Sequence, residues 1–217
     1  MQLPLNTLAK QKQNKIYGNS KKNPGKTLLT AFGPFPGVPR NPSSALLKEF
    51  LSISNDNTNR IMGEFIETSY EFCRYWSNGV PIKDFSLIIH LGVAMGSPNF
   101  RLEKIAKNQC SPYSPDINGK TWDKDCICQD ENQAICTDLN IEKIVFQLKT
   151  KNLPVEISDD AGNYLCNFLY YNTSLKKIKE NSNTKILFIH IPDDSLIPIH
   201  SQLKIFNSII YKIFEQI

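Results

Sequence analysis

Six cysteines supply the strongest nucleophiles in this sequence. Cys166 differs from the others because it follows the turn-like residues 159–163 and lies in the first turn of a predicted helix. The unpaired N–H groups and the positive end of the helix dipole stabilise a thiolate there, and the same N–H groups can receive a developing oxyanion. A buried structural cysteine is the alternative that position alone leaves open.

Three histidines restrict the choice of a base for such a thiol. His90 lies inside the apolar run 86–92, where we expect a core or hydrogen-bonded histidine. His200 opens the last predicted helix, where we expect a surface capping role. His190 lies near the end of the apolar run 185–191, so its side chain can emerge at the edge of a sheet. A satisfied structural histidine is the alternative for His190.

A Cys–His pair works best with a third group that orients the imidazole and favours its protonated form. Glu103, in the sequence Arg-Leu-Glu-Lys at 101–104, is one candidate among the 21 acidic residues. From the residues alone, a surface charge in a segment rich in salt bridges is the simplest interpretation of Glu103.

Four more cysteines lie close together in the sequence, at positions 110, 126, 128 and 136. Their spacing differs from the paired cysteines of zinc sites, and the single residue between Cys126 and Cys128 strains tetrahedral binding of one ion. We therefore expect loop thiols and no metal.

Buried strands alternate with amphipathic helices along the chain, which favours an α/β fold. Apolar runs predict strands at 27–32, 86–92, 153–158 and 185–191, with a weaker one at 64–70. Helical spacing predicts helices at 41–51, 139–151, 164–171 and 199–215. Residues 108–138 predict a long irregular excursion. The alternation predicts a three-layer α/β/α sandwich with a mostly parallel central sheet.

Ligands of such sheets bind beyond the carboxyl ends of the strands. Phe32, Gly92, Ser158 and Pro192 lie at or near the ends of predicted strands. We therefore expect the site in the segments that follow these residues.

The net charge of +4 is carried by residues 1–26, which contain six lysines and no acid. The remaining 19 basic and 21 acidic residues give residues 27–217 a net charge of −2. We expect a solvated, flexible N-terminal arm followed by a single domain. Contact of the arm with nucleic acid or a membrane surface is the alternative, which the absence of aromatic or Arg-rich patterning disfavours.

No apolar run approaches the ~18 residues that span a bilayer, and lysines interrupt any leader-like apolar stretch near the start. We expect a cytoplasmic protein with reduced thiols and with no nucleic-acid or membrane partner.

Four segments carry motifs: residues 30–37 with 41–43 (TAFGPFPG and NPS), 102–108 (LEKIAKN), 158–167 (SDDAGNYLCN) and 188–192 (FIHIP). In their order and spacing they resemble the motifs of the pyroglutamyl-peptidase I (pyrrolidone-carboxylate peptidase) family of cysteine peptidases. The resemblance extends from about residue 27 to the C-terminus.

This resemblance implies an omega-peptidase that removes N-terminal pyroglutamyl residues from peptides through a thioester acyl-enzyme. It implies that Cys166 attacks the pyroglutamyl carbonyl, that His190 acts as base and acid, and that Glu103 holds His190. It implies no metal or organic cofactor, names peptides with N-terminal pyroglutamate as partners, and leaves a homo-oligomer open.

The pyroglutamyl residue is a neutral lactam, so its pocket needs aromatic walls and amide-type partners rather than an acidic anchor. By resemblance, the expected binding residues are Phe32, Phe35, Asn41, Gly92, Val93, Tyr164 and Leu165. For Phe32 and Phe35, a simple core position is the alternative.

The sequence departs from the family's bacterial pattern at residues 110–116, where those members carry an Arg near the oxyanion or substrate and this chain has none. Either backbone N–H groups alone hold the oxyanion, or turnover is weak. Two alternative functions remain: another thiol-dependent amidase on the same fold, which would keep Cys166 and His190, and a non-catalytic binding homologue.

Overall fold

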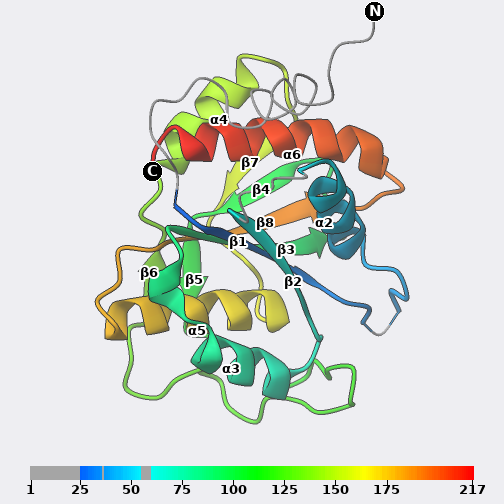
Figure 1. Cartoon of the computed structure of the whole chain (residues 1–217). Helices are drawn as coiled ribbons and strands as arrows, with labels where there is room; N and C mark the ends of the chain where they lie inside the picture. The colour runs from blue at the N-terminus through cyan, green and yellow to red at the C-terminus, as the bar shows by residue number, and fades with distance from the viewer. Residues whose placement is uncertain (1–24, 36, 55–59) are drawn as a thin grey trace, which may run out of the picture.

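The computed structural model describes residues 25–35, 37–54 and 60–217. The arm predicted at 1–26 lies outside these ranges except for its last two residues. The described residues form a central sheet between two layers of helices (Figure 1). Helices α2, α4 and α6 cover one face, and helices α3 and α5 cover the other. The predicted three-layer α/β/α architecture is confirmed.

Six strands make up the central sheet, and in their order across it they are β2 (Ile61–Ile66), β1 (Thr27–Phe32), β3 (Leu87–Ala94), β8 (Lys185–Pro192), β4 (Phe100–Glu103) and β7 (Val155–Ser158). The first four strands run parallel to one another. Strand β4 is antiparallel to β8 and parallel to β7. The sheet is therefore mostly parallel, with two strands reversed at one side.

The described helices are α2 (Pro42–Ile53), α3 (Tyr70–Gly79), α4 (Ile141–Lys149), α5 (Leu165–Lys179) and α6 (Ile199–Phe214), with a 3-10 turn η1 (Ile82–Asp84). A small second sheet pairs β5 (Ile105–Lys107) with β6 (Ala134–Cys136). Among the described helices, none is long and apolar enough to cross a membrane.

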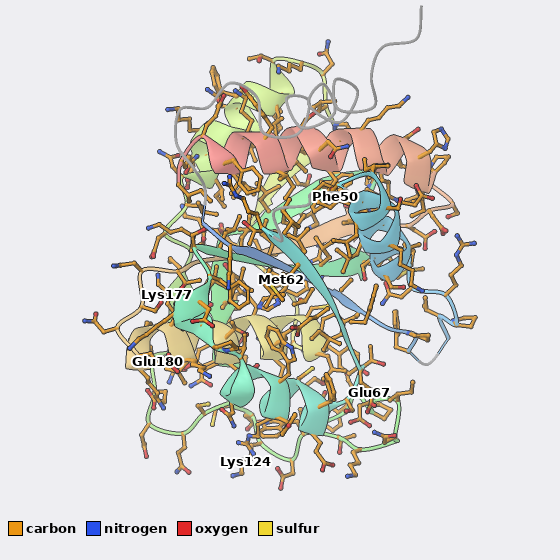
Figure 2. The ribbon with its side chains drawn as sticks, in the orientation of Figure 1. Phe50, Met62, Glu67, Lys124, Lys177 and Glu180 are labelled. Carbon is orange, nitrogen blue, oxygen red and sulfur yellow. The ribbon has the colours of Figure 1, made fainter. Side chains whose placement is uncertain are left out.

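Two apolar cores lie on the two faces of the central sheet, because successive side chains of a strand point to opposite faces. On β8, Leu187 and Ile189 pack toward α2, α4 and α6, whereas Phe188 packs toward α3 and α5. Phe50 of α2, labelled in Figure 2, meets Phe206 of α6 edge to face, with ring centroids 5.0 Å apart. The same alternation decides which polar side chains face α5.

The strongest apolar runs became strands β1, β3, β7 and β8, and all four predicted helices are present with shifted ends. The weak strand predicted at 64–70 is instead β2, three residues earlier, and Tyr70 already opens α3. Helix α3, β4 and β5 were not predicted. Strands β4 and β5 are too short for a visible pattern, and α3 depends on a cap in which the Ser69 hydroxyl accepts from Phe72 N–H. Residues 108–138 are irregular apart from β6, as expected.

The expectation for Ser158 is wrong in one respect. Strand β7 ends at Ser158 but runs opposite to β8, so this end does not meet the carboxyl ends of β1, β3 and β8. Ser158 pairs with Glu103, which pairs with Phe188 in the middle of β8. Residues 159–164 must therefore carry the chain from the middle of the sheet to the start of α5.

Candidate active site

The strand registers bring three predicted residues to the face that α5 covers. Gly92 of β3 pairs with His190 of β8, and Arg101 of β4 pairs with His190 from the other side. Glu103 lies two residues after Arg101 and therefore on the same face. These residues share one face because side chains alternate along each strand and paired residues of neighbouring strands point to the same face.

His190 and Glu103 form a buried pair, with His190 Nδ1 2.7 Å from Glu103 Oε1. Glu103 is fully buried, so the interpretation of this residue as a surface charge is wrong. The backbone carbonyl of Glu103 accepts a hydrogen bond from the Tyr170 hydroxyl at 3.0 Å, which fixes β4 against α5. The carboxylate can thus hold the imidazole ring in one orientation.

Cys166 is the second residue of α5, as predicted from the run that precedes it. Gly162, with a φ of 80°, makes the left-handed turn that leads into this helix. A Cβ atom on Gly92 would lie 2.9 Å from Cys166 Sγ and 2.8 Å from Phe188 Cζ. The absence of a side chain at Gly92 therefore leaves room for the Cys166 thiol against β3. Gly92 is the β3 residue that pairs with His190.

The charge environment of His190 favours the imidazolium form. Burial would lower its pKa, but the charge and hydrogen bond of Cys166 and those of Glu103 outweigh burial and raise the pKa to about 9. A protonated imidazole next to a thiol stabilises the thiolate, which is the nucleophilic form. The start of α5 adds unpaired N–H groups on the same side.

The remaining thiols lie in different surroundings. Burial raises the pKa of Cys73 well above its ordinary value, raises that of Cys110 to about 11, and also raises that of Cys128. Cys136 is exposed. Among the described residues, no group of three or more His, Cys, Asp or Glu could hold a metal ion.

The other histidines have the settings predicted for them, with one exception. His90 is fully buried and its Nδ1 lies 2.7 Å from the Thr30 hydroxyl. His200 is exposed, as expected, but it does not cap α6, whose N-cap residue is Pro198.

A cavity of about 280 Å³ opens beside the thiol. Nine of the ten predicted site residues line it, namely Phe32, Phe35, Asn41, Gly92, Val93, Tyr164, Leu165, Cys166 and His190. Glu103 is absent from the lining and lies behind His190. Phe32 also belongs to the core on the α5 side, so it is both a core residue and a lining residue of the cavity.

Five further residues line the cavity that the sequence did not single out as site residues: Thr68, Met95, Ala161, Gly162 and Asn163. The last three belong to the motif before Cys166, so a signal for them was present. Met95 lies in the segment after Gly92, where the site was expected, whereas Thr68 lies after β2 and its position follows only from the strand registers.

Asn41 fixes the turn after β1 against the start of α2, on one side of the cavity. Its Oδ1 accepts from the backbone N–H of Ser43 at 3.0 Å and so caps α2, and its Nδ2 donates to the Gly33 carbonyl at 2.9 Å. One amide hydrogen of Asn41 is left for a ligand.

The irregular segment after β5 braces the opposite wall. Ser111 N–H donates to the Asn163 carbonyl at 2.7 Å, and the Tyr164 hydroxyl donates to the Pro115 carbonyl at 2.9 Å. The loop that lacks the expected Arg thus supports the residues preceding Cys166.

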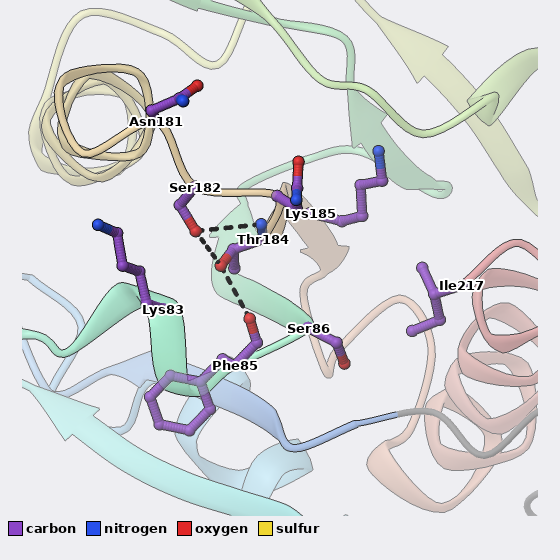
Figure 3. A pocket seen from close by; sticks show the side chains of 9 residues that line it. Lys83, Phe85, Ser86, Asn181, Ser182, Thr184, Lys185 and Ile217 are labelled. Carbon is purple, nitrogen blue, oxygen red and sulfur yellow. Dashed lines mark hydrogen bonds between the residues drawn. The ribbon is translucent and has the colours of Figure 1, made fainter.

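A larger cavity, of about 460 Å³, lies where β3 and β8 begin (Figure 3). Lys83, Ser86 and Lys185 are among its lining residues, and the lining includes no cysteine or histidine. The Thr184 hydroxyl is satisfied by the Phe85 carbonyl at 2.8 Å. This cavity offers no pair of cysteine and histidine, so the smaller one is the candidate site.

Comparison with known proteins gives a consistent result. Residues 25–208 match the family described as pyroglutamyl peptidase. The pyrrolidone-carboxylate peptidase of Lactobacillus acidophilus is 35% identical over 167 residues, which cover 77% of this chain and 83% of that protein. The enzyme of the same name from Thermosipho africanus is 32% identical over 168 residues, covering 77% and 81%.

Solved structures have the same fold. The crystal structure of pyroglutamyl peptidase I from Bacillus amyloliquefaciens matches with a TM-score of 0.77 and 26% identity, covering 88% of this chain and 97% of that one. A mutant pyrrolidone carboxyl peptidase from Pyrococcus furiosus, at 23% identity, matches with a TM-score of 0.79 over 88% and 99% of the two chains.

Proposed function

The chain belongs to the pyroglutamyl peptidase family of cysteine peptidases, and from this premise we propose the residues that carry its reaction. It removes N-terminal pyroglutamyl residues from peptides, which is the activity of the family. In our proposal Cys166 is the nucleophile, His190 the general base and acid, and Glu103 the carboxylate that orients His190.

One observation carries this assignment. The imidazole of His190 bonds to the buried Glu103 carboxylate at 2.7 Å, and the cavity that His190 lines also contains Cys166 at the start of α5. A thiol, an imidazole and a carboxylate in this order are the parts of a nucleophile activated by an oriented base.

The reaction would proceed in two halves. The Cys166 thiolate attacks the carbonyl carbon of the pyroglutamyl residue, a C–S bond forms, and the carbonyl electron pair moves onto oxygen. As this intermediate collapses, the C–N bond breaks and His190 gives its proton to the leaving amine. Water, deprotonated by His190, then attacks the thioester, releases pyroglutamate and restores the thiol.

The oxyanion would be held by backbone N–H groups. The first N–H groups of α5, at Leu165, Cys166 and Asn167, have no partner within the helix. Residues 110–116 contain no Arg that could assist. We therefore propose that the start of α5 carries this role.

The lactam would bind in the cavity beside the thiol. Phe32 and Phe35 offer aromatic surface, and Tyr164 and Leu165 offer the facing wall. The backbone of Gly92 and Val93 and the remaining amide hydrogen of Asn41 offer polar partners for the lactam. No acidic side chain lines this cavity, which suits a substrate without a free α-amine.

Hydrolysis of a fluorogenic pyroglutamyl amide tests the proposal. We expect wild type to release the fluorophore, Cys166→Ala to lose turnover to background, and Cys136→Ala to keep it, because Cys136 is an exposed thiol away from the cavity. A prolyl amide, which carries a free secondary amine in the same ring size, should be cleaved poorly. Inactive wild type would contradict the peptidase function, and turnover by Cys166→Ala would contradict the nucleophile.

A further inference from the structure

Arg101 is a charged residue that neither the cavity nor the motifs account for. It lies on β4 directly opposite His190 and on the face that α5 covers. Its side chain is 29% exposed, and it does not line the cavity beside Cys166. Its contacts nevertheless reach both Glu103 and the loop that precedes Cys166.

On one side Arg101 approaches the buried carboxylate. Its Nε lies 3.7 Å from Glu103 Oε1, the same oxygen that bonds to His190. Among the described residues, Glu103 Oε2 has no hydrogen-bond partner. An ionised carboxylate removed from water is costly unless a positive charge lies near it. Arg101 supplies such a charge from the solvent side.

On the other side Arg101 bonds to the segment that leads into the nucleophile. Its Nη2 donates to Ser158 Oγ at 2.6 Å and to the backbone carbonyl of Asp160 at 3.1 Å. Ser158 Oγ also accepts from the N–H of Asp160 at 3.2 Å. The Asp160 carboxylate accepts from the N–H of Gly162, the glycine of the turn before α5. Arg101 thus holds the base of the loop whose far end presents Cys166.

We propose that Arg101 is a positioning residue that ties the Glu103–His190 pair to the loop carrying Cys166. The planar guanidinium suits this role because it can contact the carboxylate with one nitrogen while donating to two loop oxygens with another. The inference rests on the roles proposed above for Cys166, His190 and Glu103. Arg101 acts through these residues and does not contact the substrate.

Kinetics of Arg101→Gln test the proposal on the fluorogenic pyroglutamyl amide. We expect kcat to fall about tenfold with KM unchanged, because the lactam cavity stays intact while thiol and imidazole lose alignment. The rate of Cys166 alkylation by iodoacetamide at neutral pH should fall with kcat. Arg74→Gln is the matched control, because Arg74 packs on Trp122, 4.8 Å from its ring centroid, and takes no part in the contacts of Arg101.

Two more variants separate positioning from support of the fold. Arg101→Lys keeps the charge but cannot hold the carboxylate and both loop oxygens, so its kcat should lie between those of Arg101→Gln and wild type. Ser158→Ala removes one loop partner, and combining it with Arg101→Gln should add little further loss. Wild-type kcat for Arg101→Gln, additive losses in the double variant, or full rescue by Lys would each overturn the proposal.

Failure of this inference can be told apart from failure of the proposed function. If wild type is active, Cys166→Ala is inactive and Arg101→Gln matches wild type, then only the role of Arg101 is wrong. If Arg101→Gln does not fold, Arg101→Lys and Ser158→Ala carry the test alone. A loss that tracks only the fraction of alkylatable Cys166, with normal kcat per active thiol, would also overturn a positioning role.

Discussion

The surroundings of His90 and His190 differ sharply, although both residues lie on neighbouring central strands and on the same face of the sheet. Each lies on a central parallel strand, points toward the α3 and α5 layer and is buried. The Phe188 ring lies between them, with its centroid 6.2 Å from that of His90 and 4.7 Å from that of His190. The two histidines therefore have similar backbone settings and similar burial, and they differ in the side chains that contact them.

His90 has neutral neighbours. The Thr30 hydroxyl is its hydrogen-bond partner, and Trp76 meets its ring edge to face with centroids 5.6 Å apart. Its Nε2 has no partner in the part of the chain that the structure describes. Burial lowers its pKa to about 3. His190 has the same burial, but Cys166 and Glu103 raise its pKa to about 9. Partners, not burial, raise the pKa of one buried imidazole, and burial alone lowers that of the other.

The largest effect is expected from removing the charged imidazole. His190→Ala should lower kcat about 10³-fold, because no other group in the cavity can take the thiol proton and return it to the leaving amine. Steady-state hydrolysis of the pyroglutamyl amide measures this. His90→Gln, which alters the neighbouring strand β3 two residues before the partner of His190, should keep kcat close to wild type. Equal losses in both variants would remove the distinction between the two histidines.

Removing the carboxylate partner should make His190 more like His90. Glu103→Gln keeps the shape of the side chain but removes its charge, so kcat should fall on the order of 10²-fold. KM should change little, because Glu103 does not line the cavity. Measurement of kcat and KM separately checks this. An unchanged kcat would show that the Cys166 thiol alone supports the imidazolium.

The pH profile of wild type should show the raised pKa of His190. The imidazolium that protonates the leaving amine persists above its ordinary range and is lost as the pH rises through about 9. Above that value kcat/KM should fall about tenfold per pH unit. Glu103→Gln should move this limb to lower pH, since one of the causes of the raised pKa is lost. A limb near the ordinary histidine value in wild type would contradict the role of the partners.

Much of this contrast was predictable from the sequence, and the reason lies in local patterns. The apolar runs around His90 and His190 predict buried strands, and the motif before Cys166 predicts a helix start. These features depend on neighbouring residues only. Membership of Cys166, His190 and Glu103 in one site was expected from family resemblance and not from spacing.

What could not be predicted depends on contacts between distant segments. Strand β4 has four residues, so nothing in its sequence reveals that it pairs antiparallel with β8 and buries Glu103. The contacts of Arg101 with Ser158 and Asp160 span 57 and 59 residues of sequence and follow from the same pairing. Thr68 lies after β2, and its place in the cavity follows from the parallel pairing of β2 with β1. The reversed strands β4 and β7 explain the contacts of Arg101 and the wrong expectation for Ser158.

The smallest effect on turnover, and the clearest on stability, is expected at His90. Its folded pKa of about 3 lies below the ordinary 6.5, so between these values the unfolded chain binds a proton that the folded chain does not. Stability is therefore lost as the pH falls below about 6.5, by up to about 1.4 kcal/mol per pH unit. His190 has the opposite sign, since its raised pKa adds stability at low pH that is lost as the pH rises through about 9.

His90→Gln should therefore reduce the slope of the unfolding free energy against pH on the acid side, because about one fewer proton is taken up on unfolding. It should leave kcat at neutral pH unchanged. Urea unfolding at several pH values between weakly acidic and neutral measures the slope. His200→Gln, at an exposed position, provides the control. An unchanged slope in His90→Gln would mean that His90 is solvated or protonated in the folded chain, and the contrast between the two histidines would then rest on His190 alone.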